Sequence, residues 1–126
     1  MKSARAEGLT LTPPKLKKGE ILVGAFLGPD SRGHWTVLLP GDKNNIDWKS
    51  ALAWAKKAGG DLPDRIEQAA LFARHKDKFE QRAYWSNTQL AGAAGYAWCQ
   101  GFGWGDQSYY RVSLKVRARA VRRVPI

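Results

Sequence analysis

The residues best suited to recognising a ligand lie close together near the C-terminal end of the chain. Segment 103–111 reads GWGDQSYYR and combines the tryptophan, tyrosine, arginine and amide side chains of adaptable binding surfaces. Because strand side chains alternate between faces, Tyr109 and Tyr110 point to opposite sides and at least one is expected to be exposed. The alternative is that Trp104 and one tyrosine only pack. The predicted ligand-binding residues are Trp104, Asp106, Gln107, Tyr109, Tyr110, Arg111, Arg117 and Arg119.

Residue types used in catalysis are present, but their spacing does not suit catalysis. Cys99 is the only cysteine, which excludes an intrachain disulfide, and its strand context favours a packed thiol. His34 falls in a predicted strand and His75 at a helix end, where histidine commonly caps. Asp61 and Asp64 flank a Leu-Pro pair and are typical of a turn and a helix N-cap. No glycine-rich phosphate loop occurs. We therefore predict no catalytic residues, no cofactor and no enzyme activity.

The charge of the chain is concentrated at its two ends. The formal net charge is +10, and residues 20–110 contribute none of it because their acids and bases balance. The excess lies in residues 1–19 and in residues 111–126, which contain no acid. Such asymmetry favours a polyanionic partner: nucleic acid, an anionic glycan or an acidic protein surface. The alternative is that the basic ends serve solubility. We expect the two ends to form one cationic surface if the first and last strands lie near each other.

Two parts of the chain are distinguished by composition. Residues 1–19 are predicted to be a flexible basic arm, because Pro13-Pro14 and the lysine-rich stretch after it offer little to bury. Residues 20–126 form the predicted domain. No apolar run has the length of a membrane span, and no signal peptide is visible. We therefore expect a protein that is cytoplasmic when made, with no membrane partner, and that a phage could carry on its virion.

The periodicity along the domain predicts an α+β fold: a hairpin, two helices and then a glycine-punctuated antiparallel sheet. Asp47 and Asp64 are the predicted N-caps, and Glu67 completes a capping box with Asp64. The second helix is expected to bury Ile66, Ala69, Ala70 and Ala73. Trp85 and Trp98 are assigned mainly to the core. The predicted elements are strands 20–27 and 34–39, helices 48–58 and 64–75, and strands 83–88, 96–102, 107–113 and 116–124.

Five sequence words occur in order over residues 20–124. They are Trp48…Ala51, Gly60…Leu62-Pro63…Glu67…Leu71, Tyr84-Trp85-Ser86-Asn87-Thr88, Tyr96-Ala97-Trp98 with Phe102 and Gly105, and Val116-Arg117-Ala118…Val121-Arg122. Together they resemble the C-type-lectin-like superfamily, and more narrowly the small bacterial and phage domains at the C-terminus of collagen-like adhesins and in tail-associated proteins. The resemblance implies a scaffold that hosts many ligands, often displays ligand-contacting residues in the region of 103–111, and often trimerises.

The chemistry that some relatives on this scaffold use is missing from the chain. C-type lectins that bind sugars through calcium use a Glu-Pro-Asn loop and a Trp-Asn-Asp strand, and neither occurs here. Calcium also needs several clustered oxygen ligands, whereas Asp106 is the only acid in residues 81–126. The related formylglycine-generating enzymes use two cysteines, which Cys99 alone cannot supply. The prediction is therefore a site without metal.

Two hypotheses of function follow. The first is a non-enzymatic binding module, of phage or bacterial type, that recognises a host or phage protein or an anionic polymer through its aromatic and basic C-terminal surface. The second is a cytoplasmic phage or prophage protein that binds nucleic acid or inhibits a host nucleic-acid-processing or defence machine. Exposed aromatic rings interleaved with basic residues suit single strands. A homo-oligomer remains open under both hypotheses.

Overall fold

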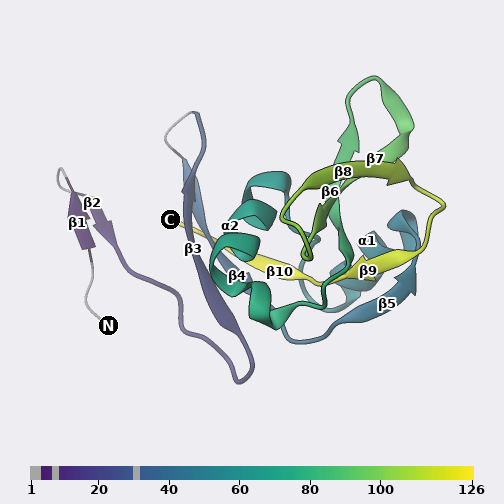
Figure 1. Cartoon of the computed structure of the whole chain (residues 1–126). Coiled ribbons are helices and arrows are strands. Elements are labelled where there is room, and N and C mark those ends of the chain that lie inside the picture. The colour runs from purple at the N-terminus through teal and green to yellow at the C-terminus, as the bar shows by residue number, and fades with distance from the viewer. Residues whose placement is uncertain (1–3, 7–8, 30–31) are drawn as a thin grey trace.

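The computed structural model of this chain describes residues 4–6, 9–29 and 32–126. The elements follow the predicted order of a hairpin, two helices and then strands, so the α+β class is confirmed (Figure 1). The elements are β1 (Ala4–Ala6), β2 (Leu9–Leu11), β3 (Ile21–Leu27), β4 (Gly33–Leu38), β5 (Lys43–Ile46), α1 (Trp48–Lys57), α2 (Arg65–His75), the 3-10 helix η1 (Lys76–Lys78), β6 (Ala83–Leu90), β7 (Ala93–Gly101), β8 (Gln107–Arg111), β9 (Val116–Ala118) and β10 (Val121–Pro125).

A three-stranded sheet joins the first hairpin of the domain to the last strand. β3 and β4 form the predicted antiparallel hairpin, and β10 pairs with the other side of β4. The last strand therefore lies near the first, as expected, although β4 separates it from β3. Val121 faces Leu38 across this pairing, and both side chains are buried.

A five-stranded sheet has the order β5-β9-β6-β7-β8, which leaves β8 at one edge. The prediction of one strand over 116–124 is wrong, because the chain leaves this sheet after β9 and enters the other sheet as β10. The Arg119 guanidinium holds the crossing by donating to the carbonyl oxygens of Lys78 and Leu39, at 2.7 and 2.8 Å. The Leu39 N–H in turn donates to the Ala120 carbonyl at 2.9 Å.

Both helices begin at the predicted caps. The Asp47 carboxylate accepts a hydrogen bond from the Ser50 N–H at 2.9 Å, at the start of α1. At α2 the Asp64 carboxylate accepts from the Glu67 N–H, and the Glu67 carboxylate accepts from the Asp64 N–H, which is the predicted capping box. These bonds satisfy backbone donors that a helix leaves unpaired in its first turn.

The predicted buried face of α2 is wrong except at Ala70, which is partly buried against the core, whereas Ala69 and Ala73 are exposed. Ile66 is 70% exposed, and the helix instead buries Glu67, Gln68 and Leu71. The buried polar side chains form hydrogen bonds that alanine or isoleucine could not form. The Gln68 side-chain amide donates to the Tyr84 and Trp85 carbonyl oxygens, both at 3.1 Å, and Glu67 accepts from an arginine of β10. Tertiary hydrogen bonds therefore decide which side of α2 faces inward.

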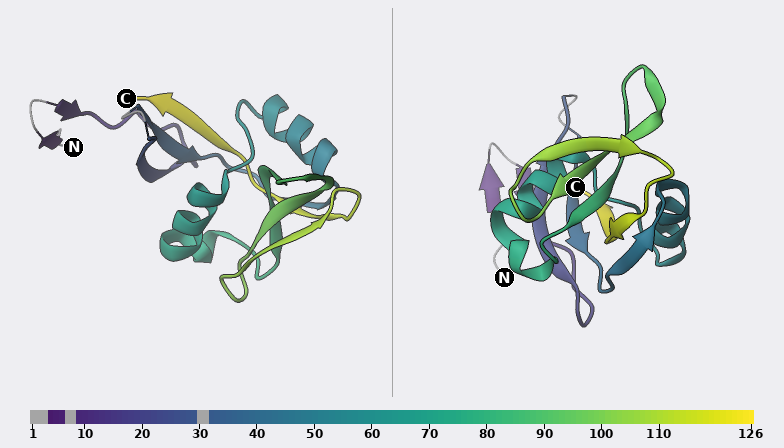
Figure 2. Two further views of the ribbon diagram at one scale, coloured as in Figure 1. Left: turned by 90° about the horizontal axis from the view of Figure 1, so that it is seen from above. Right: turned by 45° about the vertical axis from the view of Figure 1, so that its right-hand side comes forward.

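The core consists of two clusters, with the helices on opposite sides of the five-stranded sheet (Figure 2). α1 packs on the side that carries Trp85 and Cys99, whose burial is as predicted. Burial raises the pKa of the Cys99 thiol, which favours its unreactive protonated form. α2 packs on the side that carries Tyr84 and Phe102. Because Ala97 and Cys99 face the α1 side, Trp98 between them faces the other way.

The predicted basic arm contains a two-stranded hairpin, β1–β2, in which Arg5 lies opposite Thr10. The prediction that the arm is flexible falls partly on residues 1–3 and 7–8, which lie outside the described part of the chain. No helix in the described residues combines the length and apolar character needed to cross a membrane.

Candidate functional site

An aromatic–arginine face lies on the outer part of β7 and β8. We define it as Tyr96 and Trp98 of β7, Tyr109 and Arg111 of β8, and Arg65 of α2. The strand register places Tyr96 opposite Arg111 and Trp98 opposite Tyr109. Side chains of directly opposed residues share a face of the sheet, so these four form one layer. The α2 helix covers the same face beside them, and Arg65 reaches this layer from its first turn.

The rings and cations of this face alternate in contact. The Arg65 guanidinium carbon lies 3.6 Å from the Trp98 ring centroid, and Arg111 lies 5.7 Å from that of Tyr96. Tyr109 meets both Trp98 and Tyr96 edge to face, with centroids 5.2 and 6.0 Å apart. Edge-to-face pairs and cation–π contacts each contribute about 0.5–1.5 kcal/mol, so the side chains are held in place before any ligand arrives.

Gln107 fixes the position of Arg65. The Arg65 Nε donates to the Gln107 side-chain oxygen at 2.9 Å, and the Gln107 side-chain amide donates to the Arg65 carbonyl at 2.8 Å. Gln107 also donates to the Gln100 side-chain oxygen at 3.0 Å. Gln107, a predicted binding residue, therefore acts here as the support of an arginine.

Trp104 stands on the turn between β7 and β8 and is 93% exposed. The Gly105 N–H donates to the Gly101 carbonyl at 2.9 Å, and the Gly101 N–H donates to the Asp106 carbonyl at 2.8 Å. The Asp106 carboxylate accepts from the Ser108 hydroxyl at 3.2 Å. These bonds close the turn, so the indole projects from a braced loop rather than from the core.

Replacing Gly105 with alanine is expected to lower the free energy of unfolding by about 1–3 kcal/mol and to displace Trp104. Gly105 has a φ of +83°, and an added Cβ would lie 2.6 Å from the Phe72 ring. Gly92→Ala is the matched control, because its φ of +77° is similar but no atom lies within 4 Å of the added Cβ. Urea unfolding of both variants measures the difference; equal losses would contradict a role for the Phe72 contact.

A hollow of about 430 Å³ lies at the outer end of β8, lined by Tyr96, Tyr109, Tyr110, Arg111, Ser113 and Leu114. Tyr109 is 51% exposed, and Tyr110 is also exposed. The two tyrosines point to opposite faces of the strand, so the hollow lies around the sheet edge and not on one face. Six of the eight predicted residues therefore lie on the turn between β7 and β8 or on β8 itself: Trp104, Asp106, Gln107, Tyr109, Tyr110 and Arg111.

Arg117 and Arg119 are not brought to this region. Arg117 lies in β9 and Arg119 comes directly after it. Two strands, β6 and β7, separate β9 from β8 in the sheet. Arg117 pairs with the Asp42 carboxylate at 3.0 Å and also donates to the Tyr84 hydroxyl. Burial and the Asp42 carboxylate raise the pKa of Tyr84 to about 12. Arg119 makes the carbonyl contacts that hold the crossing between the sheets, so both arginines serve the fold.

Sequence reasoning missed three members of the aromatic–arginine face: Tyr96, Trp98 and Arg65. Trp98 was assigned to the core, but it lies on the face opposite the buried Ala97 and Cys99. The alternation of Tyr96-Ala97-Trp98-Cys99 carried this information, since the two small residues fit beneath a helix. No pattern in the sequence indicates the position of Arg65, because that position depends on how α2 packs against the sheet.

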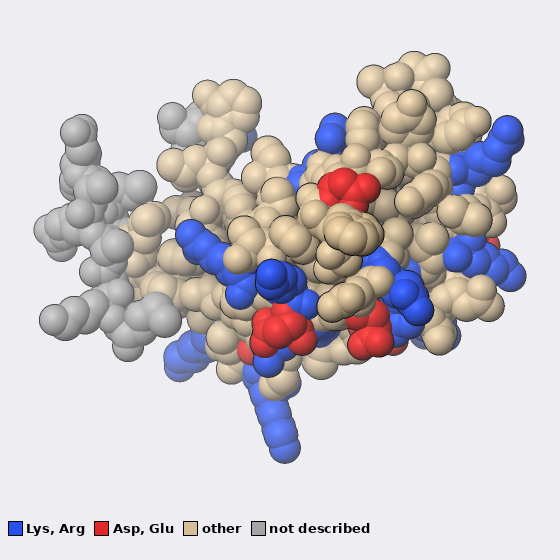
Figure 3. Space-filling view, in the orientation of Figure 1, with Lys and Arg blue, Asp and Glu red and all other residues tan. Residues whose placement is uncertain are grey.

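The basic surface is less continuous than the composition indicates. In Figure 3, lysines and arginines are scattered over this side of the molecule, with acidic residues among them. Arg122 pairs with Glu20 at 2.8 Å and donates to the Lys15 carbonyl at 3.0 Å, which brings the end of the arm beside β10. The end of the arm therefore lies beside β10, and the Glu20 carboxylate neutralises part of the positive charge there.

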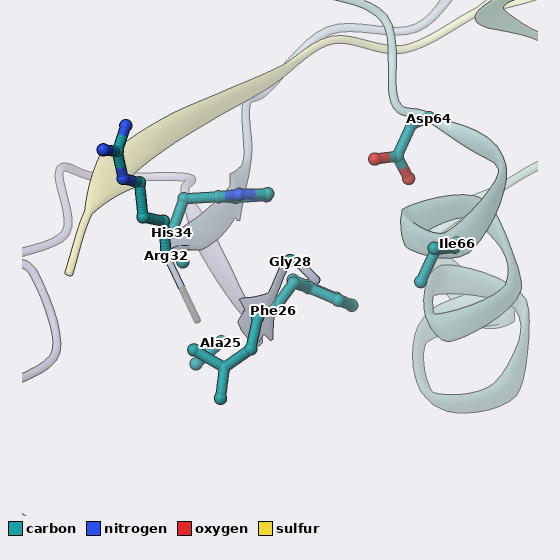
Figure 4. A pocket seen from close by; sticks show the side chains of 9 residues that line it. Ala25, Phe26, Gly28, Arg32, His34, Asp64 and Ile66 are labelled. Atoms are coloured by element: carbon teal, nitrogen blue, oxygen red, sulfur yellow. The ribbon is translucent and has the colours of Figure 1, made fainter. Parts of the chain in front are cut away.

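A second hollow, of about 470 Å³, lies between the β3–β4 hairpin and the start of α2 (Figure 4). His34 stacks on Phe26 and places its Nε2 3.0 Å from a Glu67 carboxylate oxygen. That carboxylate is already bonded to Thr36 and Arg123. The described residues that line the hollow include no serine, cysteine or lysine.

Acid is expected to destabilise the protein through Glu67 and Glu20. Burial acts to raise the pKa of Glu67, but hydrogen bonds from Arg123 and Thr36 outweigh it and lower that pKa. The Arg122 hydrogen bond lowers the pKa of Glu20 from 4.5 to about 2. Because both pKa values are lower in the folded state, the stabilisation is complete above pH 4.5 and is lost as the pH falls toward 2.

Urea midpoints measured from pH 6 to pH 2 test this expectation. The variant Glu20→Gln should show a smaller fall over that range than the unaltered protein. A constant midpoint down to pH 2.5 would contradict the prediction.

No protein-family model matches the chain, and no match to a curated protein was found.

Proposed function

We propose that this chain is a non-enzymatic binding module, on a C-type-lectin-like scaffold of phage or bacterial type, that recognises a protein or an anionic polymer. The carrying observation is the aromatic–arginine face, together with Trp104 and Tyr110. Hairpin, helices and sheet follow in the order that the resemblance implies, which supports the scaffold as a proposal.

The exposure of the large rings is the main support. Burial of an aromatic side chain stabilises a protein. Trp104 and Tyr109 are exposed and do not contribute in this way to the fold, which favours a role in binding. Aromatic and arginine residues are also the types that contribute most at protein interfaces. The rings of this face are braced by one another and by Arg65, which reduces the entropy that binding would cost.

The second candidate is binding to single-stranded nucleic acid. Exposed Trp104 and Tyr109 offer faces on which bases stack, and Arg111, two residues after Tyr109 in β8, could contact phosphate. On the side drawn in Figure 3 the basic residues are scattered among acidic ones, which favours the protein ligand first, because a strand of nucleic acid needs a continuous cationic path.

Binding to three probe classes tests the proposal: an array of acidic peptides, heparin and a 15-nucleotide oligothymidine. At least one class should bind the unaltered protein and lose at least tenfold in affinity in the double variant Tyr109→Ala/Arg111→Ala. The control Lys56→Ala/Lys57→Ala removes two exposed charges at the end of α1, away from the face. Equal affinities of the two variants for every probe would overturn the proposal.

Salt dependence separates the ligand classes. Heparin or oligothymidine binding should weaken steeply between 50 and 200 mM salt, because counterions are released from the polyanion. Binding to a peptide through rings and backbone hydrogen bonds should change far less.

A further inference from the structure

β8 is an unprotected sheet edge. Its pairing with β7 runs from Gln107 to Arg111 without a register shift, and its five residues include no lysine or proline. The opposite edge of the same sheet, β5, carries Lys43 and a shifted register, and the edge strand β3 has a shift at Gly24. Bulges and edge lysines are the usual devices that prevent strand addition. β8 lacks both devices.

The hydrogen-bond pattern shows which backbone groups of β8 face outward. The Gly101 N–H donates to the Asp106 carbonyl, and the Val112 N–H donates to the Gly95 carbonyl. In an antiparallel pair, hydrogen-bonded positions alternate along the strand. Ser108 and Tyr110 therefore direct their backbone groups toward β7, whereas Gln107, Tyr109 and Arg111 direct theirs away from the sheet.

Five of these six outward groups have no partner in the described residues. The exception is the Arg111 carbonyl, which accepts from the Leu114 N–H at 2.9 Å. The N–H and C=O of Gln107 and Tyr109, and the N–H of Arg111, remain for an incoming strand. An extended peptide also directs the backbone N–H and C=O groups of every second residue to one side, so it can pair with these groups of β8.

The side chains around this edge indicate the chemistry of the peptide. The 430 Å³ hollow extends around the edge at Tyr109 and Tyr110 and offers apolar contact on both faces of an added strand. Arg111 and Arg65 lie on one of those faces, and none of the described residues that line the hollow is acidic. Opposite charges on neighbouring strands stabilise their pairing, so acidic residues are favoured on that face.

We propose that β8 binds an extended acidic segment of a partner protein as an added sixth strand of the sheet. The backbone of Gln107, Tyr109 and Arg111 pairs with the segment, the hollow takes an apolar side chain, and Arg111 pairs with a carboxylate. This inference rests on the proposed function and names the partner chemistry of the same surface.

A blocked hexapeptide of alternating valine and glutamate is the probe, with a valine–lysine hexapeptide as its matched control. Calorimetry should show that the glutamate peptide binds the full chain at least tenfold more tightly than the lysine peptide. Amide hydrogen exchange at Tyr109 and Arg111 should slow on binding, because their N–H groups become donors to the peptide.

Two changes isolate the backbone pairing. Tyr109→Pro removes an outward N–H without removing a bond to β7 and should abolish binding, whereas Tyr109→Phe should retain it. N-methylation of the peptide on alternate residues blocks its pairing edge while leaving the protein unaltered, and it should lower affinity at least tenfold.

Retained affinity of the methylated peptide, or unchanged exchange at Tyr109, would overturn strand addition. If neither hexapeptide binds while oligothymidine or heparin binds and depends on Arg111, strand addition is wrong and the proposed function stands. If no probe binds in a way that depends on the aromatic–arginine face, the proposed function is wrong as well.

Discussion

Arg123→Met is expected to lower the free energy of unfolding by about 3–5 kcal/mol, because it leaves a buried carboxylate without its counter-charge. Glu67 is 0% exposed, and Arg123 donates to its two oxygens at 2.7 and 3.0 Å. Arg123 also pairs with Asp61 at 2.7 Å, which ties β10 to the segment before α2. Urea unfolding followed by tryptophan fluorescence measures the loss.

Arg117→Met is the matched control for this substitution. Its partner Asp42 is partly exposed, so water can replace the lost ion pair and the expected loss is about 1 kcal/mol or less. The double variant Arg123→Met/Glu67→Met should recover part of the stability, since it removes both charges together. Equal losses from Arg123→Met and Arg117→Met would contradict this account of the buried pair.

Arg111→Glu should weaken binding of the acidic hexapeptide at least tenfold, because a carboxylate then faces the acidic strand. Arg111 is exposed and its ring contact is 5.7 Å long, so the free energy of unfolding should change by less than about 1 kcal/mol. The lysine hexapeptide should bind this variant more tightly than it binds the unaltered protein. Calorimetry with both peptides measures the reversal.

Lys115→Glu provides the control for Arg111→Glu. It makes the same change in charge four residues later, in the exposed turn after β8 and outside the aromatic–arginine face. Long-range electrostatics would weaken the peptide equally in both variants, whereas direct pairing affects Arg111→Glu alone. Equal weakening would remove the pairing of Arg111 with the bound strand from the proposal.

Local signals predicted the start of each helix well. Asp47 and Asp64 cap as expected because a capping bond joins residues only three apart, and no distant contact is needed to form it. The hairpin of β3 and β4 and the paired strands β6 to β8 were also predicted, since alternation and glycine-rich turns are local too. The pairings of β10 with β4 and of β9 with β6 were not predicted, because they join strands that are far apart in the sequence.

Tertiary contacts explain the failures. α2 turns Glu67 and Gln68 inward because Arg123 and the β6 backbone provide partners for them, which no helical periodicity reveals. Segment 116–124 has an unbroken strand pattern, yet the carbonyl contacts of Arg119 split it between two sheets. Charge composition likewise counted Arg122 and Arg123 as free cations, although both are paired.

The candidate site shows the same division. Trp104, Tyr109 and Arg111 could be predicted from residue type, because exposed aromatic and arginine residues in a glycine-rich turn and edge strand favour recognition. Trp98 and Arg65 belong to the same face through the pairing of β7 with β8 and the crossing of α2. Arg117 and Arg119 were included because a single final strand would have carried them to the surface.

The most direct test of the binding face is a map of backbone amide chemical shifts for the ¹⁵N-labelled chain, recorded with each probe that binds. We expect the largest changes at residues 96–98 and 104–111 and at Arg65. Changes centred on α1 or on residues 15–20 beside Arg122, with Tyr109 and Arg111 unmoved, would contradict this expectation.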